Sequence, residues 1–421
     1  MQSALKHALQ TLGVHPSCVD VDEQIKLFLS EMDKGLRDTE PSSLMMLPTY
    51  LAAAGSMRAG QRVAVLDAGG TNLRAAQVVF DEAGRAKTLK LEKSYMPGTR
   101  GAVDSEEMFR IFAKALLPML DENGLVTVCF SYAFRSLPGG EAEILEFGKE
   151  VDVIGAVGKK VAAGIENALR ALGCTQQLQI RVINDTAAVL YAALATGCRS
   201  AVGFILGTGT NTAYMENTEN ICTASEFAAP QMLINMESGG YGLGPLGAVD
   251  RELDADSLIP GYHLHEKMTS GAYLGEITLR TAKKLAVEGF FSQKGAAALS
   301  PLQSITMPQL ADLLENAGEL AALLEAEEDR AVLRETALAV QRRAGKLVAA
   351  NIAAVLLRMR QNGETDTIAI EENGTTFQKT AALRGQCMDE LAARADRLGA
   401  YRFVQTEDDT LVGSAAAALV G

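Results

Sequence analysis

The chain has 421 residues, of which 48% are apolar, and a formal net charge of −13 that results from 39 basic and 52 acidic residues. A chain of this length exceeds the size at which one hydrophobic core usually keeps growing, so we expect at least two lobes. The acidic balance, with no lysine- and arginine-rich tract to offset it, argues against nucleic acid as a partner.

The cysteines and the apolar segments indicate the compartment. The 6 cysteines lack the C-x-x-C spacing of zinc sites and redox motifs, as is typical of reduced thiols. No stretch approaches the roughly 20 apolar residues that span a membrane, and the first ten residues have no apolar core of a secretory signal. We therefore expect a cytoplasmic protein that does not bind membranes.

In chain order, apolar residues first recur at helical spacing from Ile25 to Leu36, ahead of Pro41. The strands that the pattern then predicts cover residues 62–80, interrupted by a turn, 127–132, 178–183, 367–370 and 401–404. The later helices that it predicts cover residues 105–120, 159–172, 187–197, 265–291, 309–327, 329–360 and 414–420. Strands interleaved with helices predict an α/β fold with two lobes around a cleft.

Two segments repeat one pattern of an apolar run, a turn of glycine, threonine and asparagine, and a second extended run. They read VAVLDAGGTNLRAAQVVF (63–80) and FILGTGTNTAYME (204–216). Glycine lets backbone N–H groups approach an anion closely, and threonine and asparagine add donors. Both turns lead into a strand, whereas dinucleotide and Walker motifs, which are absent here, lead into a helix. We interpret both turns as phosphate clamps, although either turn alone could be an ordinary hairpin.

Six motifs in this order resemble those of the eukaryotic-type hexokinases, a family of the actin-like sugar kinase superfamily. They are LDAGGTNLR (66–74), FSYAF (130–134), VINDT (182–186), GTGTNTAYME (207–216), INMESGGYG (234–242) and EKMTSGAYLGEI (266–277). The resemblance implies a two-lobed actin-like ATPase fold of the ribonuclease H-like type. It also implies a small lobe of residues 58–184 plus 411–421 and a large lobe of residues 1–57 plus 185–410.

The resemblance implies that Asp185 is the catalytic base, which takes the proton of the acceptor hydroxyl during phosphoryl transfer. An N-cap of the following helix is the structural alternative, and both roles can hold together. The sugar-binding residues implied by the resemblance are Ser131, Lys149, Asn184, Asp185, Asn211, Glu237 and Glu276. Three of these have simpler interpretations, because Glu276 could pair with Arg280, Ser131 could be a buried hydroxyl, and Lys149 could be a solvated charge. The residue before Lys149 is glycine where the family has threonine, so one hydroxyl contact is lost.

ATP and Mg²⁺ are the cofactors that the resemblance implies. The residues implied for the nucleotide are Asp67, Gly69, Gly70, Thr71, Asn72 and Arg74 in the first clamp, Gly207, Thr208 and Gly209 in the second, and Gly374, Thr375, Gly413 and Ser414 in later motifs. Asp67 is expected to orient Mg²⁺ or its water shell, since magnesium on a nucleotide uses few protein ligands. Arg74 could pair with phosphate or be a solvated strand residue.

The last motif departs from the family pattern. Family members have Ser-Gly-Ser-Gly-Lys-Gly-Ala-Ala, whereas residues 408–415 read DDTLVGSA. The loss of two glycines and the lysine and the gain of two carboxylates predict weaker or less selective nucleotide binding. Gly413 and Ser414 are still expected to open a helix with free N–H groups.

These observations together predict ATP-dependent phosphorylation of a hexose, with glucose the first expectation, at its 6-hydroxyl. Two alternatives stay open, namely a kinase for fructose, mannose or an amino sugar, and a sugar-sensing paralogue with slow turnover. The expected partners are the hexose and ATP, and a homo-oligomer is possible.

Overall fold

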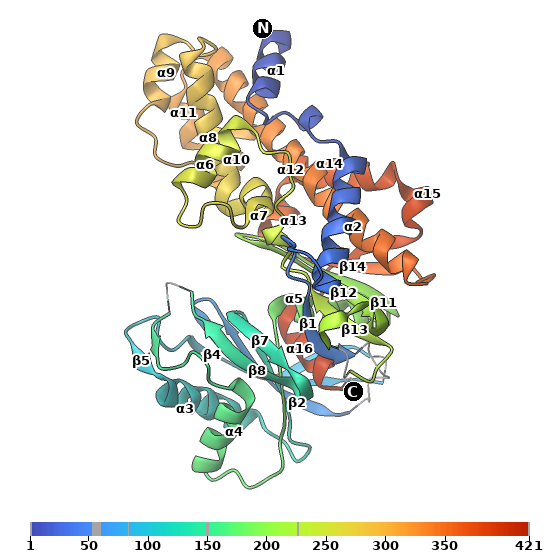
Figure 1. Cartoon of the computed structure of the whole chain (residues 1–421). Coiled ribbons are helices and arrows are strands. Elements are labelled where there is room, and N and C mark those ends of the chain that lie inside the picture. The colour runs from blue at the N-terminus through green and yellow to red at the C-terminus, as the bar shows by residue number, and fades with distance from the viewer. Residues whose placement is uncertain (1, 53–59, 83, 149–150, 225–226, 420–421) are drawn as a thin grey trace.

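Two large β-sheets, one in each lobe, organise the molecule (Figure 1). The computed structural model describes residues 2–52, 60–82, 84–148, 151–224 and 227–419. The two-lobed α/β prediction is confirmed.

The lower lobe in Figure 1 is built on a five-stranded sheet with the order β10-β6-β2-β3-β4. Its strands are β2 (Arg62–Gly69), β3 (Asn72–Phe80), β4 (Ala86–Tyr95), β6 (Leu125–Phe130) and β10 (Gln179–Ile183). β2, β3 and β4 pair antiparallel, whereas β6 lies parallel between β2 and β10. Alternate residues of β2 face opposite ways, so Leu66 packs in the cluster with α3 (Ser105–Leu116) and α4 (Val161–Ala171), while Val65 packs toward the other lobe. Two small strand pairs complete this lobe: β5 (Val103–Asp104) with β9 (Val153–Ile154), and β7 (Ala133–Leu137) with β8 (Glu141–Glu146).

The upper lobe contains a six-stranded sheet with the order β1-β13-β12-β11-β14-β15. Its strands are β1 (Leu47–Ala52), β11 (Ser200–Leu206), β12 (Thr210–Asn217), β13 (Gln231–Asn235), β14 (Ile368–Asn373) and β15 (Tyr401–Val404). β1, β13, β12 and β11 pair antiparallel in succession, and β11, β14 and β15 are parallel. Both phosphate-clamp turns are therefore tight hairpins, β2–β3 and β11–β12, at the ends of central strands.

Two helices lie between the sheets, α5 (Asp185–Ala195) and α16 (Asp409–Leu419). α5 packs on β11 and β14, whereas α16 packs on β2 and β6, and the two helices pack on each other. They cross so closely that a Cβ atom on Gly413 would lie 1.7 Å from the carbonyl oxygen of Ala188. Only glycine permits this crossing, which joins the lobes at the start of α5.

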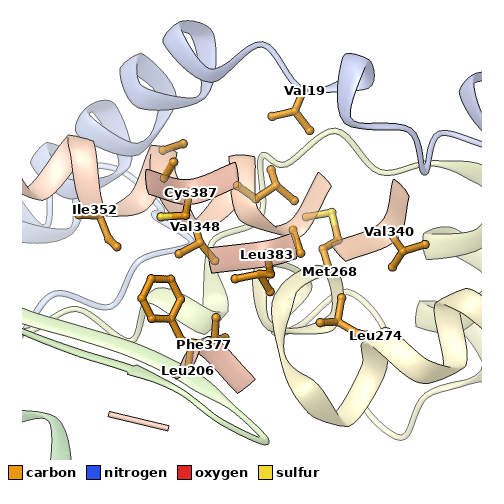
Figure 2. Close-up of a cluster of buried hydrophobic side chains, with 14 of the residues drawn as sticks. Val19, Leu206, Met268, Leu274, Val340, Val348, Ile352, Phe377, Leu383 and Cys387 are labelled. Atoms are coloured by element: carbon orange, nitrogen blue, oxygen red, sulfur yellow. The ribbon is translucent and has the colours of Figure 1, made fainter. Parts of the chain in front are cut away.

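The long helix α12 (Glu327–Gln361) is the centre of the large-lobe core, and α2 (Val21–Arg37), α8 (Gly271–Val287) and α14 (Ala381–Ala392) pack on it. Figure 2 shows part of this core, where Val348 and Ile352 of α12 lie among side chains from several elements, including Leu383 of α14. The other helices are α1 (Gln2–Thr11), α6 (Ala248–Asp256), α7 (Leu264–Thr269), α9 (Gln293–Leu299), α10 (Met307–Leu314), α11 (Gly318–Leu323), α13 (Thr375–Lys379) and α15 (Ala395–Leu398). None of the helices in the described ranges combines the length and apolar character that crossing a bilayer requires.

Three helix predictions need correction. The segment 265–291 forms two helices, because Ser270 is extended, with ψ 158°, between α7 and α8. The segment 309–327 is also divided, since Asn316 and Gly318 adopt left-handed φ values of 58° and 76° between α10 and α11. The terminal helix begins at Asp409 rather than at residue 414.

Candidate active site

Asp185 is the first residue of α5, at the junction between the lobes. The N-cap is Asn184, whose Oδ1 accepts a hydrogen bond of 2.9 Å from the N–H of Ala187. Asp185 itself accepts at Oδ1 from the N–H of Thr186 at 2.7 Å and from its hydroxyl at 3.2 Å. The capping alternative therefore applies to Asn184, and Asp185 Oδ2 accepts no hydrogen bond from the part of the chain that the structure describes.

The surroundings of Asp185 favour its protonated form. Burial, together with the negative charges of Glu237 and Asp67, raises its pKa from 3.8 to about 6, against the hydrogen bonds from Thr186, which lower it. Glu237 belongs to the expected sugar site and Asp67 to the first clamp. Asp185 is thus close enough to sense both of them electrostatically.

A network of amides and carboxylates surrounds Glu237, which follows β13. The amide nitrogens of Asn211 and Asn235 donate to Glu237 Oε1 at 3.0 and 2.7 Å, and Asn211 also donates to Asn235 Oδ1 at 2.8 Å. Glu237 adopts a left-handed φ of 53°, a conformation that a side chain other than glycine rarely takes. This strain turns the chain out of β13 while Oε1 stays bound to both amides. Glu237 Oε2 receives no hydrogen bond from the described residues.

Glu266 on α7 lies close enough to this network to feel the charge of Glu237, and it is not among the sugar-binding residues expected above. The N–H of Thr210 donates to Glu266 Oε2 at 2.9 Å. A Cβ atom on Gly209 would lie 2.7 Å from that oxygen, and one on Gly239 would lie 3.2 Å from it, so glycine at both positions makes room for the carboxylate. Burial raises the pKa of Glu266, and the nearby charge of Glu237 raises it further. Glu266 opens one of the motifs that carry the resemblance, and that position was the available signal.

Glu276 is placed differently. Its Oε1 accepts from Arg280 Nε and Nη2 at 2.9 and 2.6 Å, and Arg280 also donates to Asp256 at 2.7 Å. The simpler interpretation, a pair one helical turn apart, is the arrangement observed. We therefore replace Glu276 with Glu266 in the candidate sugar site.

Ser131 lies beside the first clamp. Its N–H donates to the carbonyl of Ala68 at 3.1 Å, and its side chain is exposed rather than buried. A Cβ atom on Gly69 would lie 3.8 Å from Asp67 Oδ1 and 3.9 Å from Ser131 Oγ, so these three residues share one small space. Lys149 lies outside the described residues.

The first clamp is the exposed turn Gly70-Thr71-Asn72 with Asp67 and Arg74 behind it. Arg74 Nε and Nη2 bind Asp67 Oδ2 at 2.7 and 2.5 Å. Arg74 Nη2 also donates to Thr410 at 2.6 Å, and Nη1 lies 3.6 Å from Asp408. Arg74 is thus a bridge to the start of α16 rather than a solvated side chain.

Asp67 fits the magnesium role expected of it. Its Oδ1 accepts no hydrogen bond from any residue in the described ranges and lies near Gly69. A carboxylate oxygen of this kind can fill one position in the water-rich oxygen shell of Mg²⁺.

The second clamp and the Gly374–Thr375 motif lie together. The N–H of Gly207 donates to the Gly209 carbonyl at 2.9 Å, and the Gly207 carbonyl accepts from Gly271 N–H and Thr376 Oγ1, both at 2.8 Å. Gly374 adopts φ 108°, and a Cβ atom there would lie 2.4 Å from the carbonyl oxygen at the end of β11. The exposed side chains at this edge are those of Thr208 and Thr375.

Gly413 and Ser414 do not open a helix, contrary to the prediction. They lie in the second turn of α16, where Gly413 packs against α5 and the buried Ser414 hydroxyl donates to the Thr410 carbonyl at 2.5 Å. Leu411 is fully buried between the sheets, so it does not face a nucleotide. The helix instead starts at Asp409, whose Oδ2 accepts from Asn373 Nδ2 at 2.6 Å. We therefore drop Gly413 and Ser414 from the candidate nucleotide site.

Comparison with known proteins identifies the family. Two family models, both described as hexokinase, match residues 10–195 and 201–420. The chain belongs to the hexokinase family of phosphotransferases. Among relatives, it is 28% identical over 416 residues to the hexokinase of Brugia malayi, a match covering 91% of this chain and 72% of that protein. It is 30% identical over 277 residues to the hexokinase of Schistosoma mansoni, covering 62% of this chain and only 60% of that relative's length.

The hexokinase fold is also evident from a solved structure, a hexokinase from Schistosoma mansoni complexed with glucose. The two structures superpose with a TM-score of 0.79 over 99% of each chain, at 24% sequence identity. At this identity the likeness establishes the fold alone.

Proposed function

We propose that this hexokinase-family protein transfers the γ-phosphate of ATP to the 6-hydroxyl of a hexose, with glucose as the first candidate. The observation that carries the proposal is the position of Asp185, whose pKa responds to both Glu237 and Asp67. A base placed there can reach an acceptor hydroxyl on one side while a phosphate lies on the other.

The acceptor site matches a neutral ligand rich in hydroxyl groups. Glu237 Oε2 and Glu266 Oε1 accept no hydrogen bond from the described residues, while the amides of Asn211 and Asn235 hold Glu237 in place. Acceptors held in this way favour a ligand that donates from several hydroxyls, since a ligand without them leaves the carboxylates unpaired. An anionic ligand would meet repulsion from the same carboxylates.

The donor site uses both clamps. The backbone of the Gly69–Asn72 turn and that of Thr208–Gly209 offer N–H groups to phosphate oxygens, and Thr208 and Thr375 offer hydroxyls. ATP would supply the phosphoryl group, and Asp67 would hold its Mg²⁺ directly or through the water shell. Asp185 then holds the proton of the acceptor oxygen, and closure of the lobes keeps water away from the phosphate.

One observation favours the slow, sugar-sensing alternative. The guanidinium of Arg74 already donates to Asp67 and Thr410 and lies near the carboxylate of Asp408. Less of its positive charge is therefore available to a triphosphate. If this effect dominates, the protein binds a hexose but turns it over slowly.

The experiment that tests the proposal is coupled detection of sugar phosphate with a panel of glucose, fructose, mannose and glucosamine, each with ATP or GTP. Asp185→Asn serves as the inactive control, and calorimetry measures sugar binding independently of turnover. We expect turnover with at least one hexose, and loss of turnover but not of sugar binding in the variant. Sugar binding without measurable turnover would support the sensing alternative, and absence of both would refute the assignment.

A further inference from the structure

A cavity of about 310 Å³ lies between α1 and α12. The helix α1 is at the end of the large lobe farthest from the other lobe (Figure 1). Leu5 and Leu9 of α1 provide an apolar wall, and Lys6, His15, Glu335 and Arg342 provide its polar groups. Its volume is at the lower end of the range of small-molecule sites. The proposed phosphoryl transfer uses none of these residues.

Two cations at this cavity have no partner in the described parts of the chain. Lys6 and Arg342 are both exposed, and neither forms a hydrogen bond or ion pair there. The neighbouring Lys346 is already engaged, because it donates to the carbonyls of Pro16 and Val19 at 3.2 and 2.8 Å. Lys6 and Arg342 therefore make the electrostatic field at this cavity positive, whereas the chain as a whole has a net charge of −13.

His15 adds a neutral donor. Burial lowers the pKa of His15, and the charges of Lys6, Lys346 and Arg342 lower it further, so the ring is neutral near pH 7. Its Nδ1 accepts from the Ser17 N–H at 3.1 Å, and in a neutral imidazole the hydrogen must then be on Nε2. The cavity therefore has an ammonium, a guanidinium and an imidazole N–H, with one carboxylate, Glu335, in opposition.

We infer that this cavity binds a small organic anion whose phosphate or carboxylate groups pair with Lys6 and Arg342 while a short apolar body contacts Leu5 and Leu9. The ligand must be small because of the volume and anionic because of the two unpaired cations. Glu335 lies two helical turns before Arg342 on the same helix and limits the affinity by repulsion.

The probe for the test is phosphoenolpyruvate, which carries a phosphate and a carboxylate on a short apolar frame. Calorimetry is performed at low ionic strength with saturating glucose and a non-hydrolysable ATP analogue, so that the catalytic cleft is filled. We expect binding that the double variant Lys6→Ala/Arg342→Ala weakens at least tenfold and that Glu335→Gln strengthens at least twofold. The matched control is Arg199→Ala, which removes an arginine that is 87% exposed elsewhere and should leave affinity unchanged.

Several results would overturn the inference. The first is the absence of binding at 10 mM phosphoenolpyruvate, roughly the upper limit for a specific small-anion site. The second is binding that disappears when glucose and the ATP analogue fill the catalytic cleft. The third is a loss of affinity in Arg199→Ala as large as that in the double variant. Inorganic phosphate, which lacks an apolar part, should bind at least fivefold more weakly, and equal affinity would contradict the role of Leu5 and Leu9. Circular dichroism confirms that each variant is folded.

Discussion

Replacing Asp185 with asparagine should make the protein slower and more stable at once. Turnover should fall by about 10²- to 10⁴-fold, the usual contribution of a general base. The stability gain follows from the pKa of Asp185, which burial and two neighbouring carboxylates raise from 3.8 to about 6. This difference in pKa means that ionising Asp185 costs about 3 kcal/mol more in the folded state than in the unfolded state. Because solvent reaches part of the side chain, we expect Asp185→Asn to gain about 1–3 kcal/mol in the free energy of unfolding.

The sign of this effect depends on pH. Because the folded-state pKa is the higher one, the penalty is fully present above pH 6 and disappears as the pH falls toward 3.8. Urea unfolding of both proteins at pH 7.5 and pH 5 measures it, and pH–rate profiles of the wild type should show an acidic limb near pH 6. The reasoning fails if Asp185→Asn is no more stable at pH 7.5, or if its advantage is the same at both pH values.

Three further predictions follow from the geometry. In steady-state kinetics, Glu266→Gln should raise the KM for the hexose at least tenfold, whereas Glu276→Gln should change this KM less than twofold. The reverse order would return Glu276 to the sugar site in place of Glu266. His265 is buried, and neither of its ring nitrogens has a hydrogen-bond partner among the described residues. Burial lowers its pKa from 6.5 to about 3, so the wild type should lose about 2 kcal/mol of stability between pH 6.5 and pH 5. In His265→Phe, unfolding titrations should show that this part of the loss is gone. Gly413→Ala should destabilise the protein by about 1–3 kcal/mol or more in thermal melts, because the added methyl group meets the carbonyl oxygen of Ala188 on α5. The control is Gly385→Ala, whose added methyl group would have no neighbouring atom within 4 Å. This variant should be neutral or stabilising in the same melts.

The sequence predicted those parts of the site that depend on local backbone. The turns at Gly69 and Gly207 are recognisable because a tight hairpin with open backbone needs glycine at defined positions. The strand-to-helix junction at Asp185 was likewise recognisable, since an apolar strand ends in Asn-Asp-Thr before an apolar helix.

The parts that the sequence did not predict depend on tertiary contacts. Glu266 and Glu276 occupy one continuous motif, and only the break at Ser270 places them on different helices with different surroundings. The short helix α1 has no long apolar repeat, and its buried residues Leu5, Ala8 and Leu9 lie on the side from which it contacts α12. Gly413 resembles a residue that opens a helix, and its actual role appears only once α5 and α16 cross.

That crossing also bears on how the protein is made. The apolar helix that begins at Asp185 is covered by a helix of residues 409–419, which the ribosome adds long afterwards. Until then a nascent chain exposes the alanine-rich surface of α5, with the aggregation risk that accompanies contacts between distant segments. The helix that packs between the two sheets is consequently missing during most of synthesis, and premature termination before residue 409 should yield a chaperone-bound or degraded product rather than a slow enzyme.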